Sequence, residues 1–449
     1  MINDELDTLI GELETTLAAV FLAAILVWRT SIDYALLITA LRARDIDAAI
    51  YALHLERGAF SGYALERQSA FAKVGVVEAK ALTEDRATFY RKRGDAPLPG
   101  LPGSPLPVAR GPIYEPPRAP ARVAPPAEAG TGFLPPPAVS PLAPALPPSR
   151  PAAPSPAPLP ETTIPPRTPP TGPTLSAPGG GRIEFIFDAV NPRAEAKIRT
   201  EAGTRITGYV DEQIETARRV IADGFQRGEG PQTIATDIAG RINPISGRRE
   251  GGIVGLSAPQ ADYVDNMRRR LLSSDPNEMM KVLGRFNKDG KWVEGTGMTL
   301  RDRRFDGAIK RAIRDVAAGK ENPLTGDKID EMAAKYSDRL LKRRAEDIAR
   351  TETASGVEMA RAEATKQAME REGLPDDALT KIWIHQGGPK KARDWHLGMN
   401  GKEVTGANTM FDLPNGDQML YPHDPAGGVR NNVSCRCRGE HSVLWDFLL

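Results

Sequence analysis

The residues best suited to chemistry are the only two cysteines of the chain, which occur together as Cys435-x-Cys437. On an extended strand, residues i and i+2 face the same side, so both thiols would converge. Zinc binds Cys sulfur at about 2.3 Å and also accepts His nitrogen, usually in a four-coordinate structural site. His396 and His423 are the candidate partners. We therefore predict a closed structural zinc site formed by these two cysteines and two histidines.

Alternatives to this zinc site remain open on the residues alone. The cysteines could be small buried side chains and the histidines hydrogen-bonded loop residues; His385 and His441 are reserve ligands. A zinc-dependent enzyme is a third alternative. However, His396 is followed by Leu397-Gly398 and so does not begin the His-x-Glu pattern of zinc deaminases. The sequence also contains no His-Glu-x-x-His, Gly-x-Ser-x-Gly or phosphate-binding-loop motif. We therefore expect a protein that is not an enzyme.

Clusters of arginine on expected helices are candidates for contact with phosphate, because the guanidinium fork matches phosphate oxygens. The full sequence has 59 Lys+Arg against 58 Asp+Glu, so no whole-chain field attracts nucleic acid. Acidic residues also adjoin the clusters, which favours solvated helix faces, with DNA contact as the alternative. The candidate phosphate contacts are Arg268, Arg269, Arg270, Arg343 and Arg344.

The composition limits the class of protein further. Two cysteines in 449 residues exclude a disulfide-stapled scaffold. The acidic start, with Asp4 and Glu5, does not resemble a secretory signal. The longest apolar run, Leu17 to Trp28, is shorter than the roughly 20 residues needed to cross a bilayer. We predict a buried helix there and no stable membrane span.

Proline divides the chain into parts. Most of the 40 prolines lie between Pro97 and Pro178, and such a stretch cannot bury enough apolar surface to offset its ordering entropy. This composition predicts an extended or disordered linker that separates the flanking parts. The predicted parts are an N-terminal helical unit (1–95), the Pro-rich linker (96–181), a helical domain (182–375) and a small α+β module with the Cys-x-Cys (376–449).

Apolar periodicity supplies the elements that must position these residues. Apolar side chains recur at three- and four-residue steps from Leu6 to Trp28 and from Ile206 to Phe225, as on one helical stripe. Ser257-x-x-Gln260 is a capping box that predicts a helix start. Further helices are expected at 305–316 and 326–372, and a strand at 382–384. The predicted fold class is mainly α with a small C-terminal α+β module.

Several short motifs occur in a fixed order along the last two-thirds of the chain. They are Gly255 to Gln260, Arg303 to Asp306, Lys342 to Thr353 with its Arg-Thr-Glu-Thr end, Trp383, Arg393-x-x-His396, Gly401, Phe411, Tyr421-Pro422, and Asn431 to Arg438 with the Cys-x-Cys. This order resembles the bacteriophage Mu F-like head morphogenesis, or minor capsid, protein family over roughly residues 185–445. The proline-rich linker is not part of the family pattern.

The resemblance implies a phage minor head protein that acts in head morphogenesis, procapsid assembly and DNA packaging. It implies a place in the virion, at the portal vertex or capsid interior, and in the host cytoplasm during assembly. The implied partners are the portal protein, the major capsid or scaffold protein and, as a further candidate, packaged DNA. An N-terminal anchor on a long tether would join these partners. The rival function is a virion-carried zinc-dependent enzyme acting on nucleic acid or cell wall.

The resemblance also bears on individual residues. It strengthens the prediction of metal ligands at Cys435, Cys437 and His396, because family members commonly have these residue types at these places. Arg350 and Glu352, within the Arg-Thr-Glu-Thr segment, are interpreted first as ion-pair members. Contact with the portal protein is the alternative for this pair.

Overall fold

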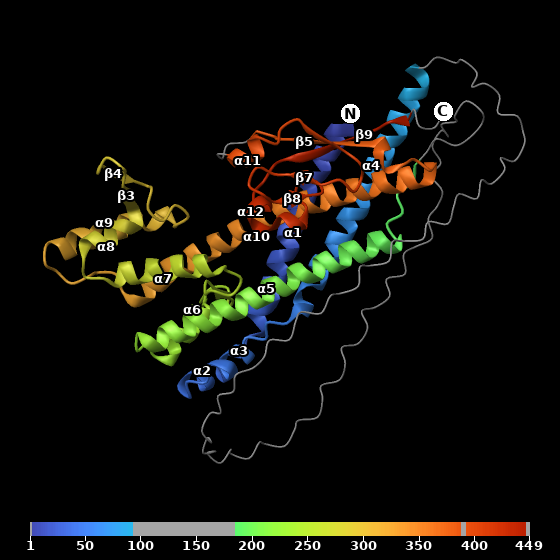
Figure 1. The fold of residues 1–449 in the computed structure, drawn as a ribbon. Helices are drawn as coiled ribbons and strands as arrows, with labels where there is room; N and C mark the ends of the chain where they lie inside the picture. The colour runs from blue at the N-terminus through green and yellow to red at the C-terminus, as the bar shows by residue number, and fades with distance from the viewer. Residues whose placement is uncertain (1, 93–184, 388–391, 446–449) are drawn as a thin grey trace, which may run out of the picture. The chain divides into compact units, whose positions relative to one another are not determined.

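The computed structural model describes residues 2–92, 185–387 and 392–445 (Figure 1). The linker predicted for 96–181 lies outside these residues. The predicted fold class is confirmed, because the described chain is mainly helical and carries small antiparallel sheets, the largest of them near the C-terminus.

Four long helices dominate the structure: α1 (Ile2–Ser31), α4 (Ser61–Lys92), α5 (Pro192–Gln226) and α10 (Gly326–Glu372). The shorter helices are α2 (Tyr34–Arg42), α3 (Ile46–Tyr51), α6 (Pro231–Ala239), α7 (Ala258–Leu272), α8 (Pro276–Leu283), α9 (Asp306–Ala317), α11 (Asp394–Leu397) and α12 (Gly428–Asn432). Short 3-10 turns are η1 (Arg57–Phe60), η2 (Arg303–Phe305), η3 (Asp376–Ala378) and η4 (Pro425–Gly427).

The strands are short and pair antiparallel. The pairs β1–β2, β3–β4 and β7–β8 are two-stranded, and a three-stranded sheet has the order β6-β5-β9. The strands are β1 (Arg241–Ile242), β2 (Arg249–Glu250), β3 (Gly284–Phe286), β4 (Trp292–Glu294), β5 (Leu379–Ile384), β6 (Lys402–Thr405), β7 (Phe411–Asp412), β8 (Gln418–Met419) and β9 (Arg438–Val443).

Local signals explain where the helices begin and end. Helix α10 begins after Thr325, whose side chain accepts from the backbone N–H of Lys328, and ends at Gly373 in the left-handed conformation. Helix α7 begins with the predicted capping box, in which the Ser257 backbone N–H donates to Gln260 Oε1 at 3.1 Å. Helix α5 is longer than its apolar stripe suggests, because Asn191 caps it at an earlier point.

The N-terminal helices and the helices after the linker share one apolar core, so the predicted separation of 1–95 from 182–375 is wrong. The Phe21 ring of α1 lies edge-on to the rings of Phe60 and Tyr209, with centroids 5.7 and 5.5 Å away. Helices α1 and α4 both pack along α10. The sequence correctly indicated that α1 must bury its stripe, but the stripe is covered by the same chain.

The chain returns to α4 after the segment that the structure does not describe. The backbone N–H of Phe185 donates to Thr83 Oγ1 at 2.9 Å, and the Phe187 ring packs on Phe71 with centroids 5.5 Å apart. The described residues on both sides of the predicted linker therefore belong to one compact unit. A tether between two separate folded parts, as the proline count suggested, does not describe this molecule.

Helix α1 is longer than the apolar run on which the expectation of no membrane span was based. Its segment Glu5–Ser31 is long and apolar enough to cross a membrane by length and composition, so the expectation stays a prediction. In this structure, Leu17, Phe21 and Trp28 on this helix are buried within the protein, whereas Leu26 and Val27 are about half exposed.

The glycine of the Gly255-Leu256-Ser257 motif has a packing role. Gly255 adopts φ +95°, and a Cβ there would lie 2.5 Å from Ile25 Cγ2 of α1. Its N–H donates to Gln213 Oε1 at 2.7 Å, and its carbonyl oxygen accepts from Arg344. Only glycine combines this backbone with so close an approach. The motif therefore joins α1, α5 and α10.

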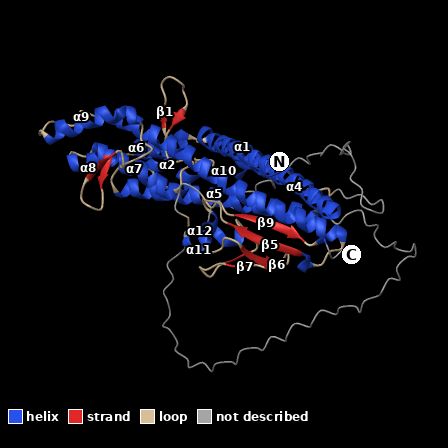
Figure 2. Cartoon of the chain, turned by 90° about the horizontal axis from the view of Figure 1, so that it is seen from above, coloured by secondary structure: helices blue, strands red, loops and turns tan. Residues whose placement is uncertain are grey.

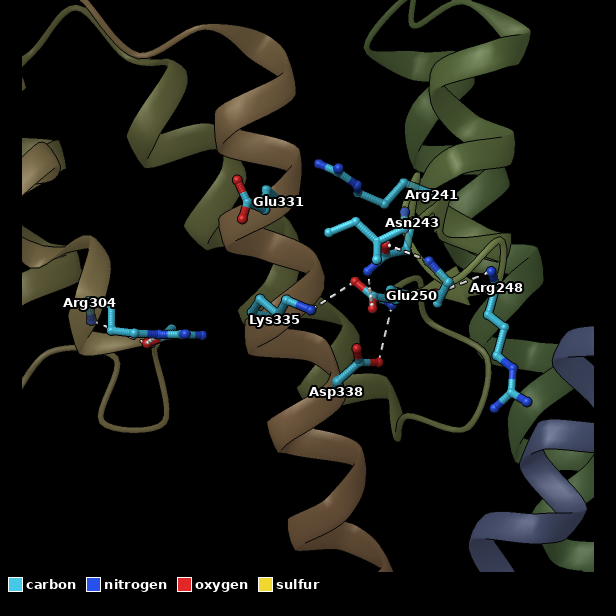
Figure 3. Close-up of polar contacts among 12 residues, drawn as sticks. Arg241, Asn243, Arg248, Glu250, Arg304, Glu331, Lys335 and Asp338 are labelled. Carbon is cyan, nitrogen blue, oxygen red and sulfur yellow. Dashed lines mark hydrogen bonds and ion pairs between the residues drawn. The ribbon is translucent and has the colours of Figure 1, made fainter.

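The β1–β2 hairpin is fastened to α10 by polar contacts (Figure 3). Glu250 accepts from Lys335 Nζ at 2.8 Å and from the Asn243 side chain. The backbone N–H of Gly251 donates to Asp338 Oδ1 at 3.1 Å. These half-buried contacts hold the hairpin on the helix, and the Arg248 side chain extends away from them (Figure 3).

The C-terminal module is built on β5, the central strand of the three-stranded sheet (Figure 2). Its side chains alternate between buried and half-buried, as the predicted strand requires. The apolar cluster on one side of this sheet contains Trp383, Met399, Phe411, Leu413, Met419 and the two cysteines. This core is small, and it surrounds the predicted metal ligands.

Candidate metal centre

Two loop segments bring the predicted ligands to the end of the sheet. Short helix α11 carries His396, and the extended segment between α12 and β9 carries Cys435 and Cys437. Cys435 and Cys437 are buried while Arg436 between them is exposed. The alternation confirms that both thiols face the same side, as the spacing predicts.

The three side chains form a compact cluster. His396 Nδ1 lies 3.3 Å from Cys435 Sγ and 3.6 Å from Cys437 Sγ. The ligand atoms of all three lie within 4.8 Å of one another, and the residues are 2%, 6% and 1% exposed, in the order His396, Cys435, Cys437. This arrangement is a group of one imidazole and two thiols that could hold a metal ion.

Asn431 orients the imidazole of His396. Its Oδ1 lies 3.4 Å from His396 Nε2 and accepts from Trp395 Nε1 at 3.0 Å. With Nε2–H directed at this amide, the lone pair of Nδ1 faces the thiols. Metal-binding histidines commonly have such an outer partner, which fixes the tautomer and the ring orientation.

The two thiols interact as a pair and are not joined by a disulfide. Their mutual hydrogen bond lowers the pKa of Cys435, because it stabilises the thiolate there, and it raises the pKa of Cys437. The backbone N–H of Cys437 also donates to Cys435 Sγ at 3.3 Å. The cluster therefore already favours a thiolate, which is the form that binds metal.

Two histidines are placed to supply a fourth ligand. His423 is 1% exposed, and neither ring nitrogen has a hydrogen-bond partner among the described residues. It lies close enough to Cys435 to lower the pKa of that thiol, although it falls outside the 4.8 Å group. His385 Nδ1 lies 3.6 Å from Cys437 Sγ. The reserve ligand His441 points elsewhere, since its Nδ1 lies 2.8 Å from Thr365 Oγ1.

The position of His385 follows from strand register. Ile384 of β5 pairs with Arg438 of β9 in an antiparallel register. His385, which follows Ile384, therefore lies opposite Cys437, which precedes Arg438. Local sequence gives no sign of this pairing, because the two residues are distant in the chain. The antiparallel register of β5 and β9 is the signal that identifies His385 as a candidate fourth ligand.

The part of α10 from Thr351, within the Arg-Thr-Glu-Thr segment, to Glu358 supports the loops that carry the ligands. Thr351 Oγ1 accepts from the backbone N–H of Ser434 at 3.4 Å, directly before Cys435. Ser355 Oγ donates to the carbonyl oxygen of His423 at 3.1 Å. One turn further, Glu358 Oε2 accepts from the Gly439 N–H at 3.0 Å. This part of α10 is the platform of the candidate metal centre.

Glu352 of the same segment is an internal ion-pair member. Its side chain is 4% exposed; it pairs with Arg67 of α4 and lies 3.3 Å from Arg205 of α5. Arg67 also donates to Glu201 at 2.8 Å. The ion-pair interpretation is therefore confirmed for Glu352, whose carboxylate is buried and occupied within the chain, whereas contact with the portal protein stays a prediction. Sequence analysis did not identify Arg67 or Glu201.

Arg350 lies nearer the surface than Glu352. Its side chain is 27% exposed and approaches Asp347 at 3.4 Å and Glu14 of α1 at 3.9 Å. Arg350 is thus also paired within the chain, at the boundary between α1 and α10.

The arginines proposed for phosphate contact all have carboxylate neighbours. Arg268 and Arg344 are the most buried, and they bridge helices rather than face a ligand. A guanidinium so occupied is a poor phosphate site, because the carboxylate would first have to be displaced. The pairs are Arg268 with Asp237 and Asp330, Arg269 with Asp265, Arg270 with Glu278, Arg343 with Asp347, and Arg344 with Glu212.

Comparison with known proteins identifies no similar protein or structure. No protein-family model, curated protein or solved structure matches the chain. The likeness to the Mu F-like family consequently rests on the ordered motifs of the sequence.

Proposed function

We propose that this protein is a minor head component of a phage or prophage, with a role in head morphogenesis, procapsid assembly and DNA packaging. It acts as a rigid assembly part at the portal vertex or capsid interior, and it is in the host cytoplasm during assembly. Its partners are the portal protein and the major capsid or scaffold protein.

One observation carries this proposal: motifs that are far apart in the sequence support one another in space. The Arg-Thr-Glu-Thr segment holds the Cys-x-Cys loop through Thr351, and Ser355, two residues after that segment on α10, holds the His423 loop. The upstream Gly255 motif contacts the same helix through Arg344. The residues on which the resemblance depends thus serve the architecture of one body, as expected for an assembly protein.

We further propose that the cluster binds structural zinc through His396, Cys435 and Cys437. His423 or His385 would supply the fourth ligand. Two sulfur and two nitrogen donors suit zinc, and a closed four-coordinate site contributes folding energy. The burial of all three clustered side chains favours this role over a virion-carried zinc enzyme, whose metal needs an open position for substrate.

Particle association tests the proposed function. The full chain, tagged and expressed from its own phage or prophage, should sediment with procapsids and filled heads and should co-purify with portal protein. A chain that stays at the top of the gradient, while portal and capsid proteins sediment as particles, would rule the function out. A tagged cytoplasmic enzyme of similar size serves as the control for trapping inside particles.

A further inference from the structure

A cavity lies between α7, α8, the β3–β4 hairpin and α10, apart from the candidate metal centre. Its volume is about 710 Å³. Four aromatic side chains line it: Tyr263, Phe286, Trp292 and Tyr336. Phe286 is 65% exposed and Tyr263 is 49% exposed, so ring faces are accessible from solvent.

Cations accompany these rings. Arg270, Lys281 and Arg285 line the cavity, and no carboxylate does so among the described residues. Arg270 and Lys281 approach Glu278, which lies outside the lining. Arg285 is exposed and forms no ion pair within the part of the chain that the structure describes. The cavity therefore combines accessible rings with an uncompensated positive charge.

The hairpin is built to hold its rings in place. The Phe286 and Trp292 rings lie 5.2 Å apart at 67° on paired positions of β3 and β4. Gly284 lies beneath the indole, and a Cβ there would be 2.5 Å from Trp292 Cζ2. The absence of a side chain at Gly284 lets the indole lie flat against the strand.

We propose that this cavity binds a nucleobase together with its phosphate, as part of a single-stranded nucleic acid. Bases stack on accessible aromatic rings irrespective of sequence, and Arg285, which has no ion-pair partner among the described residues, attracts the phosphate. An acidic peptide would use the cations but would leave the exposed rings without a flat partner. A free nucleotide shares the chemistry of the strand and differs only in its source. The inference does not depend on the proposed function.

Fluorescence anisotropy with the full-length protein tests this site. The probe is a labelled oligothymidylate of roughly 12 nucleotides, within the usual range for such sites. Unlabelled strand should compete, while the matched duplex and poly-glutamate should compete far less, because neither offers a free base. Competition by dTMP at lower concentration than the strand would identify the source as a nucleotide. Equal competition by poly-glutamate or by duplex would overturn the proposal.

Two variants locate the binding. Phe286→Ala should weaken binding about tenfold through lost stacking. Arg285→Ala should weaken it and lower the slope of log affinity against log salt by about 0.7, the value for one phosphate of a single strand. The controls are Tyr51→Ala, an equally exposed ring elsewhere, and Arg248→Ala, an exposed side chain that extends away from the contacts of the β1–β2 hairpin (Figure 3). If both cavity variants bind like these controls, the site is elsewhere and the proposal fails.

Discussion

The helical region and the C-terminal module are stabilised in different ways. In the helical region, long apolar stripes such as that of α1 pack against α4, α5 and α10 in one large core. In the module, the local apolar cluster is small and contains both cysteines. The helical region is thus stabilised by a large apolar core together with a buried ion-pair cluster, whereas the module combines a small apolar core of its own with buried polar groups and the His–Cys cluster.

Lys381 illustrates how the module uses polar groups. It is 3% exposed on the central strand, and its Nζ donates to the carbonyl oxygens of Ala407, Thr409 and Leu420. Burial lowers its pKa to about 8. The hydrogen bonds of this one side chain thereby hold the irregular loops on the sheet. The long helices are held together mainly by side-chain packing.

Removal of the proposed zinc should have the largest effect and should separate the two regions. Purified protein should contain one zinc per chain, and Cys437→Ser should lose it, with several kcal/mol of stability lost from the module. Hydrogen exchange should then accelerate in β5 and β9 while α1 and α4 stay protected. Arg436→Ser, at the exposed position between the ligands, is the matched control. Unchanged exchange in metal-free protein would contradict a structural role.

The buried ion pair is a test within the helical region. Glu352→Gln leaves the Arg67 guanidinium buried with one carboxylate partner fewer, and we expect a loss of about 3 kcal/mol in the free energy of unfolding. Urea denaturation measures it. Glu346→Gln on the same helix, where the side chain is 41% exposed, should change stability little. Equal effects of the two substitutions would mean that the buried pair does not hold α4 to α10.

Loss of the lysine clamp should be smaller. Lys381→Met leaves three carbonyl oxygens without their donor, at a cost of about 2 kcal/mol. Thermal unfolding followed by calorimetry should show this loss. Lys402→Met, at an exposed position on neighbouring β6, is the control for a change of charge alone. A variant as stable as the control would show that water replaces the lysine without penalty.

Acidification should weaken the module gradually. Burial lowers the pKa of His441 to about 3, so the folded protein cannot protonate this ring where the unfolded chain does. Between about pH 6.5 and pH 3 the unfolded state then binds more protons, so stability falls as the pH is lowered through this window. The melting temperature of His441→Asn should depend less on pH than that of the parent. An identical pH dependence would assign the acid sensitivity to other groups.

Features fixed by neighbouring residues could be predicted from the sequence. Helix α10 has the predicted bounds because Thr325 caps its start and Gly373 ends it. The convergence of Cys435 and Cys437 follows from a spacing of two on extended chain. His396 was identified because imidazole and thiol are natural ligands for one metal.

Features fixed by long-range packing could not be predicted in this way. The pairing of Arg67 with Glu352 and the placement of His385 beside Cys437 join distant parts of the chain. An apolar stripe indicates that one face of a helix must be buried, but it does not indicate which other element buries that face. For this reason, the sequence predicts a separate unit for the N-terminal helices, although they complete the common core.

The return of the chain to α4 has a consequence for how this protein tolerates damage. The described residues before and after the undescribed segment are already joined by core packing and by the contact of Phe185 with Thr83. A protease that cuts the chain once between these two sets of residues would therefore leave two polypeptides that stay associated as one folded unit. For the same reason, the coding sequence between them could gain or lose codons with little consequence for the folded body.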